Sequence, residues 1–193
     1  HARVAAVAAV HLLGRRRLGW LKELEVDVPI EVLCETNGPG DDLKLVLANG
    51  HAIEAQAKKG LTRGQELWSA LASLANGIHV KSIAYGVLVV DSDASATIRR
   101  ELARGIVRLG EGRSDSHHEI TSEFLRRLES AGLPVQAVCS RLRIVVAHCA
   151  DHDDASEQVA KSELLRLCAT ERDADAAWTA LQLSAHSLIE RRG

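Results

Sequence analysis

This chain has few aromatic side chains and no net positive charge. Phe, Trp and Tyr make up 3% of the 193 residues, and the formal net charge is −2 at pH 7. So few aromatic residues argue against stacking platforms for single-stranded nucleic acid and against base-flipping pockets. The net charge also excludes a protein that coats DNA passively, because neutralising phosphates needs several clustered cations. Any contact with nucleic acid would therefore use local basic patches and the duplex backbone.

Cysteine motifs and membrane-length apolar runs are missing as well. The cysteines are far apart in the sequence and share no Cys-x-x-Cys spacing: Cys34, Cys139, Cys149 and Cys168. A zinc ribbon or redox pair is therefore not expected, and buried free thiols are. Since no apolar run is long enough to cross a bilayer, we expect a cytoplasmic protein.

Methionine is absent and the first residue is His1, which indicates a segment of a longer, multidomain polypeptide. A hydrophobic content of 46% over this length is enough for one α/β core. We expect a single domain over 1–193, with a core at about 1–150 and closing helices at about 151–193.

The segment 41–58 is the most informative part of the chain, because it predicts a β-hairpin with a polar face. Alternating residues predict strands at 42–48 and 51–58, joined by a tight turn at Asn49-Gly50. Since successive side chains of a strand point to opposite faces, Glu54, Gln56 and Lys58 share one face. Burying them unpaired would cost roughly 1 to 3 kcal/mol each. A metal site or an open cleft would satisfy them.

Asp42 lies across the hairpin from this polar face. Oxygen atoms of Asp42, Glu54 and Gln56 are ligands that suit Mg²⁺ or Mn²⁺. Lys58 beside the metal would orient an attacking water and offset the charge that develops on a phosphorane. The set is typical of phosphodiester hydrolysis without a covalent intermediate. On pattern alone, a surface hairpin with solvated lysines explains these residues equally well.

Asp42, followed by Gln56-Ala57-Lys58, resembles the Asp…(Asp/Glu/Gln)-x-Lys signature of the restriction-endonuclease-like superfamily, in its Mrr-type Gln-x-Lys form. With the alanine-rich opening helix and the Trp68-bearing helix, the chain is similar to N-terminal nuclease domains of bacterial anti-phage STAND or AAA-type NTPases and related CBASS-type effectors. Related nuclease domains are fused to cyclic-oligonucleotide receptors. The resemblance implies an α/β fold, with a mixed central sheet flanked by helices and a C-terminal helical extension.

The resemblance also implies roles for individual residues. Asp42 would be the metal-binding acid, with Asp41 as a rival, and Lys58 would be the catalytic lysine. Gln56 would occupy the position of the usual second acid.

Gln56 is neutral, so a further acid, Glu35 or Glu54, would have to strengthen the metal site. Lys59 and Arg63 follow the hairpin and precede a helix whose N-terminus can face a phosphate, so we expect both to bind DNA.

The predicted function is a Mg²⁺-dependent deoxyribonuclease, an endonuclease effector that cleaves double-stranded DNA in bacterial antiviral defence. We expect a covalently linked NTPase or sensor domain and a homo-oligomer when activated. The alternative is an inactive nuclease-fold module for DNA binding or oligomerisation. An RNase of the same fold also stays open, because no feature reports recognition of the 2′-hydroxyl.

Outside the hairpin, hydrophobic periodicity predicts the remaining elements. We expect helices at about 1–13, 63–76, 95–109 and 117–131, strands at about 30–35, 83–90 and 142–148, and two closing helices. The elements after residue 95 are interpreted as a helical lobe on the core.

Overall fold

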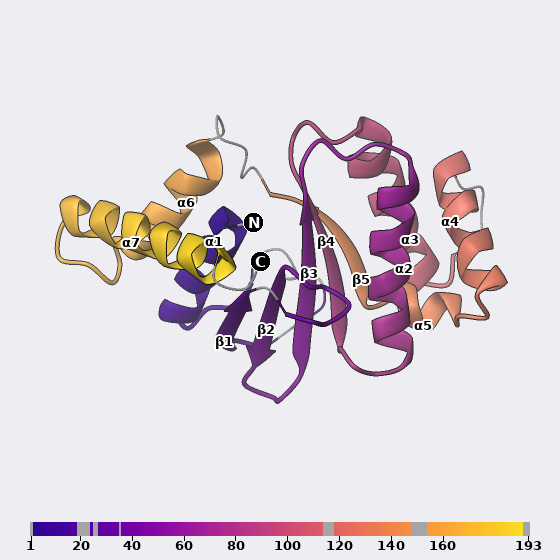
Figure 1. The fold of residues 1–193 in the computed structure, drawn as a ribbon, viewed down its shortest axis with the longest axis horizontal. Helices are drawn as coiled ribbons and strands as arrows, with labels where there is room; N and C mark the ends of the chain where they lie inside the picture. Colours follow the sequence, from indigo (N-terminus) through magenta and orange to yellow (C-terminus); the bar gives the residue numbers. More distant parts are fainter. Residues whose placement is uncertain are drawn as a thin grey trace.

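Five strands form one mixed sheet, and their order across the sheet is their order along the chain (Figure 1). The computed structural model describes residues 2–18, 24, 27–34, 36–113, 118–147 and 154–190, without the side chains of 154–156. The strands are β1 (Pro29–Cys34), β2 (Leu43–Leu47), β3 (Ala52–Lys58), β4 (Tyr85–Val90) and β5 (Leu142–Val146). Strands β1 to β3 pair antiparallel, and β3 to β5 pair parallel. Parallel neighbours need long crossovers, which the helices supply.

The predicted hairpin is confirmed as β2 and β3. Leu43 pairs with Ala55 and Lys44 with Glu54 across the two strands. The turn between them contains Gly50 at a φ of 80°, in the left-handed region that glycine adopts without a steric penalty.

The helices lie on the two sides of this sheet (Figure 1). They are α1 (Ala2–Leu13), α2 (Gln65–His79), the π-helix η2 (Thr97–Leu102), α3 (Ala103–Gly110), α4 (Glu119–Ser130), α5 (Val135–Cys139), α6 (Asp154–Leu164) and α7 (Glu171–Glu190). The prediction of a mixed sheet flanked by helices, with a helical C-terminal extension, is confirmed. Within the described ranges, no helix combines the length and the apolar character that a membrane span needs.

Both faces of the central strands are buried. Leu88 and Val90 of β4 pack in one cluster with α2, η2 and α3, whereas Val87 and Val89 pack on the other face with α1. The predicted helical lobe after residue 95 is therefore wrong, because η2 and α3 complete the core beside α2 and β5 extends the same sheet. Helix α5 was not among the helices predicted from the sequence.

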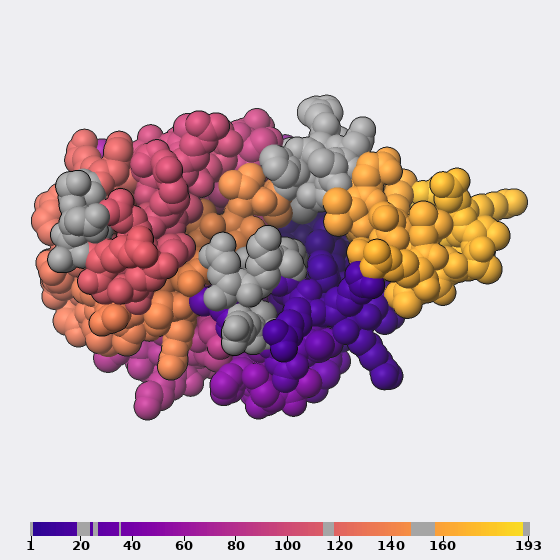
Figure 2. Space-filling model, turned by 180° about the vertical axis from the view of Figure 1, so that it is seen from behind, coloured from indigo at the N-terminus to yellow at the C-terminus, as the bar shows by residue number. Residues whose placement is uncertain are grey.

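A third apolar cluster joins α1 to the closing helices, which Figure 2 shows in orange and yellow beside the indigo N-terminal part. Val10 of α1 packs there with Ala160 and Leu164 of α6 and with Trp178 of α7. Of the cysteines, Cys34 and Cys139 are buried and Cys168 is half-buried. Cys149 lies outside the described residues.

We expect Leu71→Ala to lower the free energy of unfolding by about 2 to 5 kcal/mol, because it leaves a cavity among the residues of the α2 core. Leu71 is fully buried in that cluster. Leu183→Ala is the matched control, since Leu183 of α7 is 65% exposed, and it should change the value by less than about 0.5 kcal/mol. Urea unfolding of both variants checks the prediction, and equal effects would contradict it.

Candidate functional site

The polar face of β3 looks toward α2, and it is closed rather than open. Glu54 and Gln56 are 2% and 8% exposed. The alternation predicted from the sequence is confirmed, because the intervening residues belong to the cluster on the other face: Ile53, Ala55 and Ala57. These buried polar groups therefore need partners inside the protein.

Glu54 has two such partners. Its Oε2 accepts a hydrogen bond from the backbone N–H of Gly40 at 2.9 Å, and its Oε1 lies 3.3 Å from Nζ of Lys44. Lys44 is the residue directly opposite on β2. A Cβ atom on Gly38 would overlap the Glu54 carboxylate, so the backbone lies against that group. The contacts give Glu54 a structural role, and its predicted part in a metal site stays a prediction.

The segment Gly38–Gly40, which we call the strap, is held down from two sides. The carbonyl oxygen of Pro39 accepts hydrogen bonds from Gln56 Nε2 and from Ser73 Oγ of α2, both at 2.9 Å. On α2, a Cβ atom at Gly77 would lie 2.4 Å from Cγ of Pro39. The strap therefore fixes the start of β2 against both β3 and α2.

Asp42 follows the strap and is brought to the backbone of β3. It is 9% exposed, and its Oδ2 accepts a hydrogen bond of 2.6 Å from the N–H of Ala57. Burial raises the pKa of Asp42 above its ordinary value, and the charge of Asp41 adds to the rise. The hydrogen bond from Ala57 and the charge of Lys58 oppose it. The structure thus brings Asp42 and Lys58 together, as predicted.

Lys58 is the last residue of β3 and marks the open end of the polar face. Its Nζ lies 3.8 Å from the carboxylate of Glu66 in the first turn of α2. Glu66 is largely exposed, so this ion pair contributes little to stability. Just beyond it the chain turns at Gly60, whose φ of 60° is left-handed. Lys58 is therefore a basic group at this end of the sheet, beside Asp42.

Asp91 is a buried acid at the same edge that the sequence reasoning missed. It follows β4 and is 6% exposed. Its Oδ1 accepts hydrogen bonds from the N–H groups of Gly60, at 2.9 Å, and Ala94, at 3.0 Å, while its buried Oδ2 has no hydrogen-bond partner among the residues that the structure describes. An acid placed directly after an apolar strand could have revealed it, because ligands of parallel sheets bind at the carboxyl ends of the strands.

The predicted metal site is only partly assembled. Asp41 is exposed beside Asp42, and Glu35 lies outside the described residues. Across the described ranges, no group of three His, Cys, Asp or Glu side chains is placed to hold a metal ion. Asp42 and Gln56 are left as the oxygen donors on this face. Such a pair suits Mg²⁺ only where the ligand adds oxygen atoms of its own.

The two residues predicted to bind DNA differ in their surroundings. Lys59 is exposed next to Lys58. Arg63 makes ion pairs with Glu119 at 2.8 Å and with Glu123 at 2.6 Å, both on α4. These hydrogen bonds raise the pKa of Arg63. Arg63 therefore ties the start of α2 to α4, and its DNA contact stays a prediction.

Comparison with known proteins gives a likeness of fold. No family model and no curated protein matches the chain. A Cap4 SAVED/CARF-domain containing receptor of Moraxella osloensis superposes with a TM-score of 0.58 and 11% identity, over 97% of this chain and 42% of that one. The corresponding receptor of Acinetobacter baumannii gives 0.55 and 12%, over 95% and 41%. The chain therefore spans less than half the length of these receptors.

These matches correct the predicted family and function. The sequence predicted a restriction-endonuclease-like nuclease domain, whereas the structures that share this fold are described as SAVED/CARF-domain containing receptors. The predicted family is wrong, and the endonuclease function and its inactive nuclease-fold alternative, which rested on it, are wrong with it. The physical reason is that the signature is short. The buried polar residues that supported it, Glu54 and Gln56, hold the strap.

We expect Glu54→Ala to lower the free energy of unfolding by about 2 to 3 kcal/mol, because it leaves the buried N–H of Gly40 without an acceptor. Glu66→Ala removes an exposed carboxylate instead and should cost less than about 1 kcal/mol. Chemical unfolding of both variants tests this role. A Glu54→Ala variant as stable as the wild type would show that the carboxylate does not hold the strap.

Asp42 should make the stability of the fold depend on pH. Because its pKa is raised in the folded state, the contribution is fully present below the ordinary value of 3.8 and is lost as the pH rises through the folded value. Asp42→Asn keeps an acceptor for Ala57 but does not ionise. We therefore expect this variant to gain stability relative to the wild type as the pH rises from below 3.8. Unfolding at a series of pH values measures the difference, and a constant difference would contradict the prediction.

Proposed function

We propose that this chain is a ligand-binding domain of a larger receptor, and that it binds a phosphate group of its ligand at the C-terminal end of β3. The observation that carries the proposal is the approach of Asp42 to the backbone of Ala57, next to Lys58, at the edge where parallel strands end. The fold that the chain shares with two receptors supports the first part. The position at the carboxyl ends of the strands supports the second.

Lys58 supplies the positive charge for this interaction. An ammonium group binds phosphate as a point charge and does not need a fixed geometry. Helix α2 begins just beyond it, and its N-cap residue, Gly64, makes no side-chain capping hydrogen bond. The first N–H groups of such a helix favour an anion. The negative charge of Glu66 repels the anion, so the positive charge of Lys58 has to outweigh it.

A Mg²⁺ ion fits this site as a partner of the bound ligand. Gln56 donates its amide N–H to Pro39, which leaves its Oε1 without a partner among the described residues. That oxygen and the Asp42 carboxylate are donors of the kind that Mg²⁺ prefers, with phosphate oxygens completing the coordination. The ion would neutralise charge on the phosphate, and these two residues would hold it on the polar face.

The linked partner domain and the cellular context expected from the sequence are compatible with such a receptor. A linked partner domain fits a chain that spans less than half the length of the similar receptors. Bacterial defence, a cytoplasmic location, oligomerisation and duplex DNA as the source of the phosphate stay predictions. DNA therefore enters the test as one of the probes.

We expect Lys58→Ala to weaken binding of Mg²⁺-pyrophosphate at least about tenfold, since it removes a charged hydrogen bond worth roughly 1.5 to 3 kcal/mol. Isothermal titration calorimetry of the full chain measures the affinity, with Mg²⁺ alone and a short DNA duplex as further titrants. Tighter binding of the duplex would assign the phosphate to a nucleic acid.

Lys81→Asn is the matched control for this experiment. Lys81 is exposed before β4, at the other end of the sheet, and its φ of 60° is one that asparagine tolerates. It removes the same charge and should leave the affinity unchanged. Equal affinities of the wild type and Lys58→Ala, or no binding of any probe at millimolar concentration, would overturn the proposal.

A further inference from the structure

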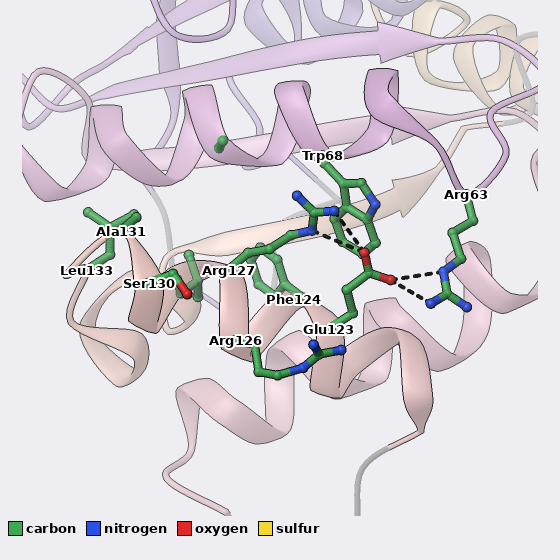
Figure 3. A pocket seen from close by; sticks show the side chains of 11 residues that line it. Arg63, Trp68, Glu123, Phe124, Arg126, Arg127, Ser130, Ala131 and Leu133 are labelled. Atoms are coloured by element: carbon green, nitrogen blue, oxygen red, sulfur yellow. Dashed lines mark hydrogen bonds and ion pairs between the residues drawn. The ribbon is translucent and has the colours of Figure 1, made fainter.

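A groove lies between α2 and α4, away from the end of β3 (Figure 3). Its volume is about 750 Å³, within the range of roughly 300 to 1,000 Å³ typical of small-molecule sites. Trp68, Phe124 and Leu128 line its floor, and Arg63, Arg126 and Arg127 line its rim. Asp42 and Lys58 do not contribute to it.

The two helices are connected across this groove by polar side chains. The guanidinium of Arg127 lies 4.7 Å from the ring centroid of Trp68, within the distance of a cation–π interaction. Arg127 and Arg63 both form ion pairs with Glu123, at 2.9 Å and 2.6 Å. Their hydrogen bonds hold the pKa of Glu123 below its usual range, so this acid stays charged. Figure 3 shows Glu123 between the two arginines. The rim is therefore an ordered network.

Arg126 does not take part in this network. Glu119 and Glu123 are the carboxylates that pair with Arg63 and Arg127. Arg126 is exposed on α4 and makes no ion pair or hydrogen bond with any described residue. Its guanidinium therefore keeps all five N–H donors. Three cations against two acids leave the rim with a net positive charge.

The groove also has apolar surface, which can bind the part of a ligand that a charged rim cannot. Trp68, Phe124 and Leu128 are buried and belong to the main core, so the accessible apolar surface of the groove comes from the exposed Ala72 and Ala131 and the half-buried Leu133. An apolar body laid on this surface would gain the favourable free energy of leaving water. A planar anionic group on the same molecule would meet the fork of Arg126, which binds carboxylate and phosphate in two-point geometry.

We propose that the groove binds a small organic anion with a flat apolar body and a phosphate or carboxylate head. The body packs against Ala72, Ala131 and Leu133, beside the Trp68–Arg127 pair, and the head pairs with Arg126. The site is independent of the one at the end of β3, because none of its lining residues belongs to the polar face of β3.

Isothermal titration calorimetry of the full chain with 1-naphthyl phosphate tests this proposal. We expect Arg126→Ala to weaken binding roughly tenfold or more, as for the loss of one charged hydrogen bond. Ala72→Phe should also weaken it, because the exposed Ala72 lines the groove and a larger side chain fills it. 1-Naphthol should bind at least tenfold more weakly than its phosphate ester, because it has no anionic head to form the charged hydrogen bond with Arg126.

One variant serves as the control. Arg104→Ala removes an exposed guanidinium that pairs with Glu101 on η2 and should leave binding unchanged. Equal affinities of the wild type and Arg126→Ala, equal binding of 1-naphthol, or no binding at millimolar concentration would overturn the proposal.

Discussion

The buried carboxylate of Glu54 is the contact on which the arrangement of the candidate site depends. A charge inside a protein is tolerated only where it is paired and hydrogen-bonded, and here Lys44 and the N–H of Gly40 supply both. The bond to Gly40 fixes the strap, and the strap fixes the start of β2. Asp42 is consequently held where its carboxylate reaches the backbone of Ala57. One buried carboxylate thus positions a functional candidate without touching it.

Local patterns predicted most of this fold. The alternation around Asn49-Gly50 identified β2 and β3, and the periodicity of the apolar residues identified α2 and the closing helices. What they did not predict was which elements share a core. Helix η2 and α3 were expected in a separate lobe, but their apolar stripe, which includes Ile98 and Leu102, packs in the same cluster as α2. That outcome is set by long-range packing, which periodicity does not encode.

The sequence predicted which residues lie together better than it predicted what each of them does. The sequence placed Glu54, Gln56 and Lys58 on one face, as the structure does, but a pattern of residue types does not say which polar groups bond to the backbone. Glu54 and Gln56 bond to the strap, 14 to 17 positions away in the chain. Asp91 and the groove at Arg126 were missed because both arise where separate segments meet.

The contact between Pro39 and Gly77 has a consequence for related sequences. Since no side chain fits at position 77 while a proline lies against it, the two positions cannot vary independently. A relative with alanine or a larger residue at position 77 should have lost the proline and carry a differently shaped loop before β2. Paired substitution at these positions would therefore distinguish relatives that keep this placement of Asp42 from those that share only the sheet.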